Sequence, residues 1–91
     1  MSIFVRFRPV SATTQQYDET ISRLQSSGDF PPDGLEYHVA FSEGDQLRVG
    51  EVWASQEQFE AFGQRLMPIL AEMGIDPGQP EIDQVHNTIK P

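Results

Sequence analysis

The sequence predicts an α+β domain whose elements follow the order strand, helix, strand, strand, helix, strand. Three observations predict this fold class. Four segments alternate apolar and polar residues with the period of two that is typical of strands, and two other segments repeat apolar residues at helical spacing. A tight turn joins the two central strands, and a length of 91 residues fits one domain. We therefore expect a single domain over residues 1–91.

The first half of the chain supplies a strand, a helix and a second strand. Residues 2–9 alternate as a strand does, and a proline closes this segment. A helix follows, because Thr13 and Gln16 have the spacing of a capping box and apolar residues then recur on one face. Gly28 marks the end of this helix. After a proline-rich loop, residues 35–42 form the clearest strand pattern in the chain.

The second half repeats this order after a hairpin. A turn at Gly44 leads into a returning strand over residues 46–54. Ser55 is the expected cap of a second helix, whose apolar residues are Phe59, Phe62, Leu66, Ile69, Leu70 and Met73. Pro68 lies inside this pattern, so we expect a kinked helix or two shorter ones. The last strand is predicted over residues 81–89.

These elements predict a ferredoxin-like plait. Right-handed crossovers put both helices on one face of an antiparallel sheet with strand order 4-1-3-2. The other face is expected to be open and of mixed character, formed by Phe4, His38, Ala40, Gly50, Val52 and Ala54 together with Arg6 and Arg8. An open face of this kind indicates a partner. Since so short a chain has a small core and no disulfide, we expect a homodimer.

The composition excludes several partners. The chain has 14 acidic and 6 basic residues, and its net charge of −8 repels the phosphates of nucleic acids. No window holds the ~20 apolar residues that span a bilayer, and no signal peptide is visible. The chain has no cysteine, which fits a reducing compartment. We expect a cytoplasmic protein with no nucleic-acid or membrane partner.

The junction between the third strand and the second helix has a distinctive pattern. It consists of Glu-Val-Trp, a capping serine and an acidic turn that ends in an aromatic residue, and it reads Gly50-Glu51-Val52-Trp53-Ala54-Ser55-Gln56-Glu57-Gln58-Phe59. This segment resembles the same junction in the dimeric α/β-barrel superfamily, which includes the antibiotic-biosynthesis monooxygenase group. The resemblance implies that two plaits dimerise sheet to sheet into an α/β barrel. It also implies a small-molecule-binding or cofactor-independent monooxygenase-like protein. Such proteins commonly carry a histidine in the second helix, where this chain has none.

Two residues are candidate catalytic groups. His38 suits a general base because histidine titrates near neutrality, and the alternative is a half-buried structural histidine. Glu51 interrupts an otherwise apolar strand face, so its carboxylate is expected where desolvation is costly. It acts either as a base or acceptor for a ligand, or as the buried partner of Arg6 or Arg8.

Four residues are candidate ligand-binding groups. Tyr37 and Trp53 suit the lining of a cavity for a small apolar or aromatic ligand, although aromatic residues at such positions are also ordinary core. His86 and Asn87 belong to the predicted last strand, at an edge of the sheet. In the barrel this edge would meet the edge that carries His38. Nothing in the spacing demands a metal there, so we predict no metal site.

Familiar catalytic signatures are missing. The sequence has no glycine-rich phosphate loop, no cysteine nucleophile, no serine elbow and no spacing of metal ligands. We therefore predict no cofactor. Two functions stay open: a small-molecule site in which His38 or Glu51 moves a proton, and a non-catalytic dimeric regulatory or scaffolding protein.

Overall fold

Four strands and two helices follow one another in the predicted order. The computed structural model describes residues 1–91. The elements are β1 (Ile3–Phe7), α1 (Thr14–Ser26), β2 (Leu35–Glu43), β3 (Gln46–Trp53), α2 (Gln56–Glu72) and β4 (Glu81–Gln84). Neither helix is long and apolar enough to cross a membrane.

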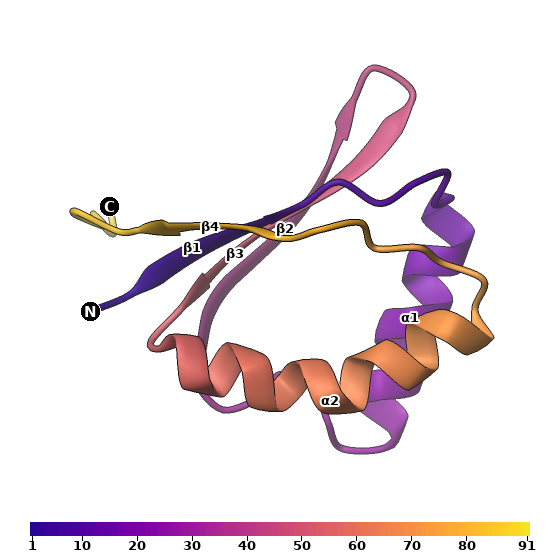
Figure 1. Cartoon of the computed structure of the whole chain (residues 1–91), viewed down its shortest axis with the longest axis horizontal. Helices are drawn as coiled ribbons and strands as arrows, with labels where there is room; N and C mark the ends of the chain where they lie inside the picture. The colour runs from indigo at the N-terminus through magenta and orange to yellow at the C-terminus, as the bar shows by residue number, and fades with distance from the viewer.

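The strands form one antiparallel sheet in the order β2-β3-β1-β4. This is the predicted order 4-1-3-2 viewed from the other edge, so the α+β ferredoxin-like topology is confirmed. Both helices lie on the same side of the sheet, and the β2–β3 hairpin extends beyond them (Figure 1). The opposite side of the sheet carries no helix.

The core lies between the sheet and the helices. Its central members are Ile3, Val5, Leu24, Trp53 and Phe62, which come from two strands and both helices. The side chains of Val5 and Trp53 have no exposed surface. Because strand residues two apart point to the same face, the alternation in β1 directs this apolar set toward the helices.

The helix ends follow the chemistry read from the sequence. The Thr13 hydroxyl accepts from the Gln16 backbone N–H and the Gln16 side chain accepts from the Thr13 N–H, which completes the capping box of α1. Ser55 caps α2 by accepting from the Gln58 N–H. The expected division of α2 at Pro68 does not occur, since one helix runs from Gln56 to Glu72. Leu66 and Ile69, on either side of the proline, both pack against the core.

A β-bulge near the start of β2 sets which residues face the helices. Leu35 pairs with Trp53, and Tyr37 pairs with the residue just before Trp53 in β3. Glu36 is therefore an extra residue in β2 that has no partner. Beyond the bulge, His38 and Ala40 point toward the helices. Their assignment to the open face was therefore wrong, because a bulge does not interrupt the alternation in the sequence. The open face instead carries Tyr37, Val39 and Phe41.

The last strand is shorter than predicted. β4 ends at Gln84, which pairs with Ile3, the first residue of β1. Beyond that point the neighbouring strand has almost no residues left to pair with, and one further bond joins the Val85 N–H to the Ser2 carbonyl. His86 and Asn87 consequently lie outside β4, and both are exposed.

Candidate functional site

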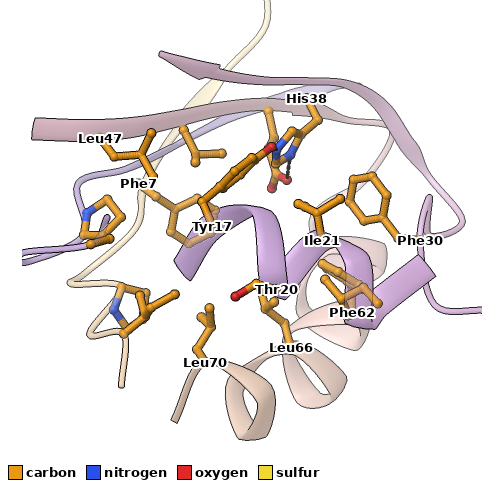
Figure 2. Close-up of a pocket in the computed structure, with 17 residues that line it drawn as sticks. Phe7, Tyr17, Thr20, Ile21, Phe30, His38, Leu47, Phe62, Leu66 and Leu70 are labelled. Carbon is orange, nitrogen blue, oxygen red and sulfur yellow. Dashed lines mark hydrogen bonds and ion pairs between the residues drawn. The ribbon is translucent and has the colours of Figure 1, made fainter. Parts of the chain in front are cut away.

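A mostly apolar cavity of about 80 Å³ lies between the sheet and the helices. Figure 2 shows side chains from β1, β2 and β3 on one side of it and side chains from α1 and α2 on the other. The loops before α1 and after α2 complete the wall. The polar side chains that line the cavity are those of Tyr17, Thr20, His38 and Glu51.

Three of these polar side chains form a continuous hydrogen-bonded chain. The Tyr17 hydroxyl lies 2.7 Å from His38 Nε2, and His38 Nδ1 lies 2.6 Å from Glu51 Oε2. The Trp53 indole N–H donates to the other carboxylate oxygen, Oε1, over 3.0 Å. Since a carboxylate accepts hydrogen bonds, the proton between His38 and Glu51 belongs on Nδ1. His38 Nε2 then accepts from the Tyr17 hydroxyl.

The backbone explains how these residues meet. Glu51 and Trp53 are two apart on β3 and therefore share a face. The register places His38 directly opposite Glu51, an arrangement that depends on the bulge in β2. Tyr17 comes from the first turn of α1. Its ring lies nearly parallel to the His38 imidazole, with centroids 5.8 Å apart, while the Phe30 ring is nearly perpendicular to that imidazole, with centroids 5.5 Å apart. His38 is thus held on two sides.

Glu51 lies deep in the structure, with 5% of its surface exposed. The expected pairing with Arg6 or Arg8 was wrong. Arg6 is opposite Gly50 in the register, so its side chain points to the open face, where its guanidinium lies over an aromatic ring. Arg8 forms an ion pair with Glu81. No lysine or arginine lines the cavity, and His38 and Trp53 are the groups that hold the carboxylate.

The environment of Tyr17 changes its acidity. Burial raises the pKa of the Tyr17 phenol above its ordinary value of 10.0, and the negative charges of Glu51 and Asp18 raise it further. The phenol is therefore protonated at neutral pH. This protonation state agrees with its role as donor to His38 Nε2.

The structure brings some predicted site residues together and separates others. His38, Glu51 and Trp53 meet, although Trp53 is completely buried behind the carboxylate and does not line the cavity. Tyr37 lies on the open face with 38% of its surface exposed, so its assignment to the cavity was wrong. The cause is again the bulge in β2, which turns Tyr37 away from the helices. His86 is exposed beyond β4, away from the cavity lining. No group of three or more His, Cys, Asp or Glu side chains is arranged to hold a metal ion.

Tyr17 is the site residue that sequence reasoning missed. Tyr17, Ile21 and Leu24 have the i, i+4, i+7 spacing of a core-facing helical stripe, and this spacing alone predicts only packing. A useful signal was present in its chemistry, because a tyrosine on a buried face needs a partner for its hydroxyl. His38 is that partner.

No protein-family model matches the chain, and no curated protein matches it. Solved structures do match over nearly its whole length. SnoaB, a cofactor-independent oxygenase from Streptomyces nogalater, has a TM-score of 0.64 and 13% identity, with 97% of this chain and 94% of SnoaB covered. A proposed antibiotic-biosynthesis monooxygenase from Chloroflexus aurantiacus has a TM-score of 0.64 and 18% identity, with 97% of both chains covered.

This chain has their fold. Rv0793 from Mycobacterium tuberculosis is similar too, with a TM-score of 0.63 at 14% identity over 98% of this chain and 97% of its own. The resemblance inferred from residues 50–59 is thereby confirmed for the monooxygenase-like fold. At these identities the likeness concerns the fold, and the chemistry has to be argued from the residues of this chain.

Proposed function

We propose that this protein binds a small apolar molecule in the cavity and removes a proton from it, in the manner of a cofactor-independent monooxygenase. The observation that carries the proposal is the His38–Glu51 pair, a hydrogen-bonded base and carboxylate in the wall of an otherwise apolar cavity. Glu51 holds the Nδ1 proton and so orients the imidazole. It also stabilises the imidazolium that forms when His38 takes a second proton.

The apolar surroundings fit this chemistry. An oxygenase without a cofactor has only its substrate as a source of electrons for dioxygen, and removal of a proton makes a substrate electron-rich. A base in a water-poor cavity is therefore the group that such a reaction requires. SnoaB, which is described as a cofactor-independent oxygenase, has the same fold. This agreement supports the proposed type of activity, while the substrate stays open.

The size of the cavity adds a condition. Sites for small molecules usually measure about 300–1,000 Å³, so a cavity of about 80 Å³ must widen before it admits more than a few atoms. We expect widening at the two loops that complete the wall. They are joined by an isolated bridge in which the Val10 N–H donates to the Asp76 carbonyl over 2.9 Å.

We further propose that the protein works as a homodimer through its open sheet face. Val39 and Phe41 expose 56% and 42% of their surface there, and no element of the same chain covers them. Val39→Asp should convert a dimer into a monomer in size-exclusion chromatography with light scattering. Met67→Asp is a matched control, because Met67 is 52% exposed on α2, on the helix side. A wild-type monomer, or a Val39→Asp dimer, would contradict this interface.

Proton abstraction can be tested before the substrate is known. We suggest following deuterium exchange of the acidic C–H groups of 2-indanone in D₂O by ¹H NMR. The wild type should exceed the buffer rate, and His38→Ala should lose about 10²–10⁴-fold of the enhancement, as expected for a general base. His86→Ala is the control, since His86 is exposed outside the cavity. The proposal fails if the wild type shows no enhancement or if His38→Ala retains it.

One observation favours the alternative of a non-catalytic regulatory or scaffolding homodimer. Every buried side-chain nitrogen and oxygen already has a hydrogen-bond partner, so the interior needs no ligand to be satisfied. A native mass spectrum of protein purified without denaturant separates the two functions. A dimer with a retained small molecule supports the binding site, whereas a bare dimer that fails the exchange assay supports the alternative. The cytoplasmic location stays a prediction from the sequence.

A further inference from the structure

We infer that Tyr17 is the residue that receives the ligand's proton, and that the proton reaches His38 only through its phenolic oxygen. The inference rests on the proposed function and deepens it, because it names the catalytic group that touches the ligand. Tyr17 crosses from α1 toward His38 at the wall of the cavity (Figure 2). Both side chains line the cavity, and the Tyr17 hydroxyl occupies the Nε2 position of the base.

Few side-chain groups of the cavity wall are free to accept a hydrogen bond from a ligand. His38 has two ring nitrogens, of which Nδ1 is bonded to Glu51 and Nε2 to Tyr17. Both oxygens of Glu51 are also engaged, one with His38 and one with Trp53. His38 thus offers no free ring nitrogen to a ligand, and the Glu51 oxygens, each already in one hydrogen bond, belong to a residue with 5% of its surface exposed. The Tyr17 oxygen donates one hydrogen bond and keeps lone pairs that can accept another.

The Thr20 hydroxyl is the other hydroxyl group that lines the cavity. It donates to the Gln16 carbonyl in its own helix over 2.8 Å. A carbonyl oxygen of a helix does not act as a base at neutral pH, so a proton delivered to Thr20 has no onward path. Tyr17 is bonded directly to an imidazole and does have such a path. Of these two hydroxyl groups, only that of Tyr17 connects the ligand to a base.

The transfer balances with two proton movements. The ligand's O–H, N–H or acidic C–H bond breaks and its proton goes to the Tyr17 oxygen, while the Tyr17 proton moves to His38 Nε2. The products are a ligand anion, a neutral tyrosine and an imidazolium that faces the Glu51 carboxylate. Because burial raises the pKa of Tyr17, the phenol is neutral before the transfer as well as after it. Tyr17 therefore passes a proton on and does not store a charge.

The test uses a pair of probes that differ by one hydroxyl, 4-fluorophenol and fluorobenzene, titrated by ¹⁹F NMR. Wild-type protein should bind the phenol about 2- to 10-fold more tightly, which is the effect of one hydrogen bond. Tyr17→Phe should abolish this preference and keep the affinity for fluorobenzene. It should also reduce the 2-indanone exchange to the buffer rate. Tyr37→Phe, which alters an exposed tyrosine on the opposite face, should change neither result.

A structural role of Tyr17 gives the opposite result. If Tyr17 only locks the imidazole, Tyr17→Phe frees Nε2, and the exchange of 2-indanone becomes as fast as in the wild type or faster, which overturns the inference. The ¹⁵N shifts of the His38 ring should show Nδ1 still protonated in Tyr17→Phe, so that a lost exchange is not due to a displaced base. A wild type that binds neither probe overturns the proposed function together with the inference. A wild type that binds both, with the preference retained in Tyr17→Phe, overturns the inference alone.

Discussion

Replacement of Glu51 by alanine should destabilise the fold by about 3 kcal/mol. The Trp53 side chain has no exposed surface, and Glu51 is the acceptor of its indole N–H. A buried donor that loses its partner costs about 1–3 kcal/mol. His38 loses an acceptor too, although its cost is smaller because 16% of its side chain is exposed and water can reach it. The melting temperature of a domain of this size should fall by roughly 12–24 °C.

Glu51→Gln separates the hydrogen bonds from the charge. The amide keeps the shape of the carboxylate, accepts from Trp53 through its oxygen and offers its NH₂ group to His38 Nδ1. His38 then has to carry its proton on Nε2 and donate to the Tyr17 oxygen, so the hydrogen-bonded chain reverses its direction. We expect a loss of at most about 1 kcal/mol. The ¹⁵N shifts of the His38 ring should report the change of tautomer.

Urea unfolding measures both variants. Trp53 is the only tryptophan, so its fluorescence follows the very environment that the substitution alters. The protein concentration must be the same in all samples, because a dimer is stabilised by mass action. The reasoning is refuted if the free energy of unfolding of Glu51→Ala stays within about 0.5 kcal/mol of the wild-type value, since a buried donor without an acceptor costs more than that. It is also refuted if Glu51→Gln costs as much as Glu51→Ala.

Two further predictions concern Tyr17 and a glycine. Burial raises the pKa of Tyr17 above 10.0, so its phenol stabilises the fold below about pH 10, and this stabilisation is lost as the pH rises through the raised pKa. Urea unfolding at about pH 9 and about pH 11 should show less alkaline destabilisation in Tyr17→Phe than in Tyr37→Phe. Gly34→Ala should cost about 1–3 kcal/mol for its positive φ, and more because the new Cβ would lie 2.5 Å from the Gln58 side chain. Gly28→Ala, with a positive φ in open space, should lose less in the same assay, and equal losses would contradict the steric part.

Much of the fold could be predicted because its signals are local. The capping residues Thr13 and Ser55 fixed where both helices begin, and alternation in the strands fixed the element order and hence the topology. The end of β4 could not be predicted in this way. It depends on where β1 begins, and the alternation of residues 81–89 carries no information on its partner.

The candidate site was predictable only in part. Glu51 stood out because a carboxylate interrupted an apolar face, and it is indeed buried. The sequence predicts an arginine as its partner, because the alternation in β2 does not reveal the extra residue that turns His38 toward the same face. Tyr17 was hidden for another reason, because an aromatic residue in a helical stripe has the same spacing whether its hydroxyl is used or not. The partner of Glu51 and the use of the Tyr17 hydroxyl both depend on how distant segments pair and pack. Local periodicity carries no information on this.

The bulge at Glu36 decides both which β2 side chains face the cavity and which lie on the open face. If Glu36 were instead paired as an ordinary strand residue, every later side chain of β2 would change sides, so that His38 would leave Glu51 while Val39 and Phe41 would turn inward. The base in the cavity and the apolar residues of the open face would therefore be lost in one step. Such a regular pairing would leave the order of elements intact and remove both features together, whereas deletion of Glu36 itself would straighten β2 and keep His38 opposite Glu51.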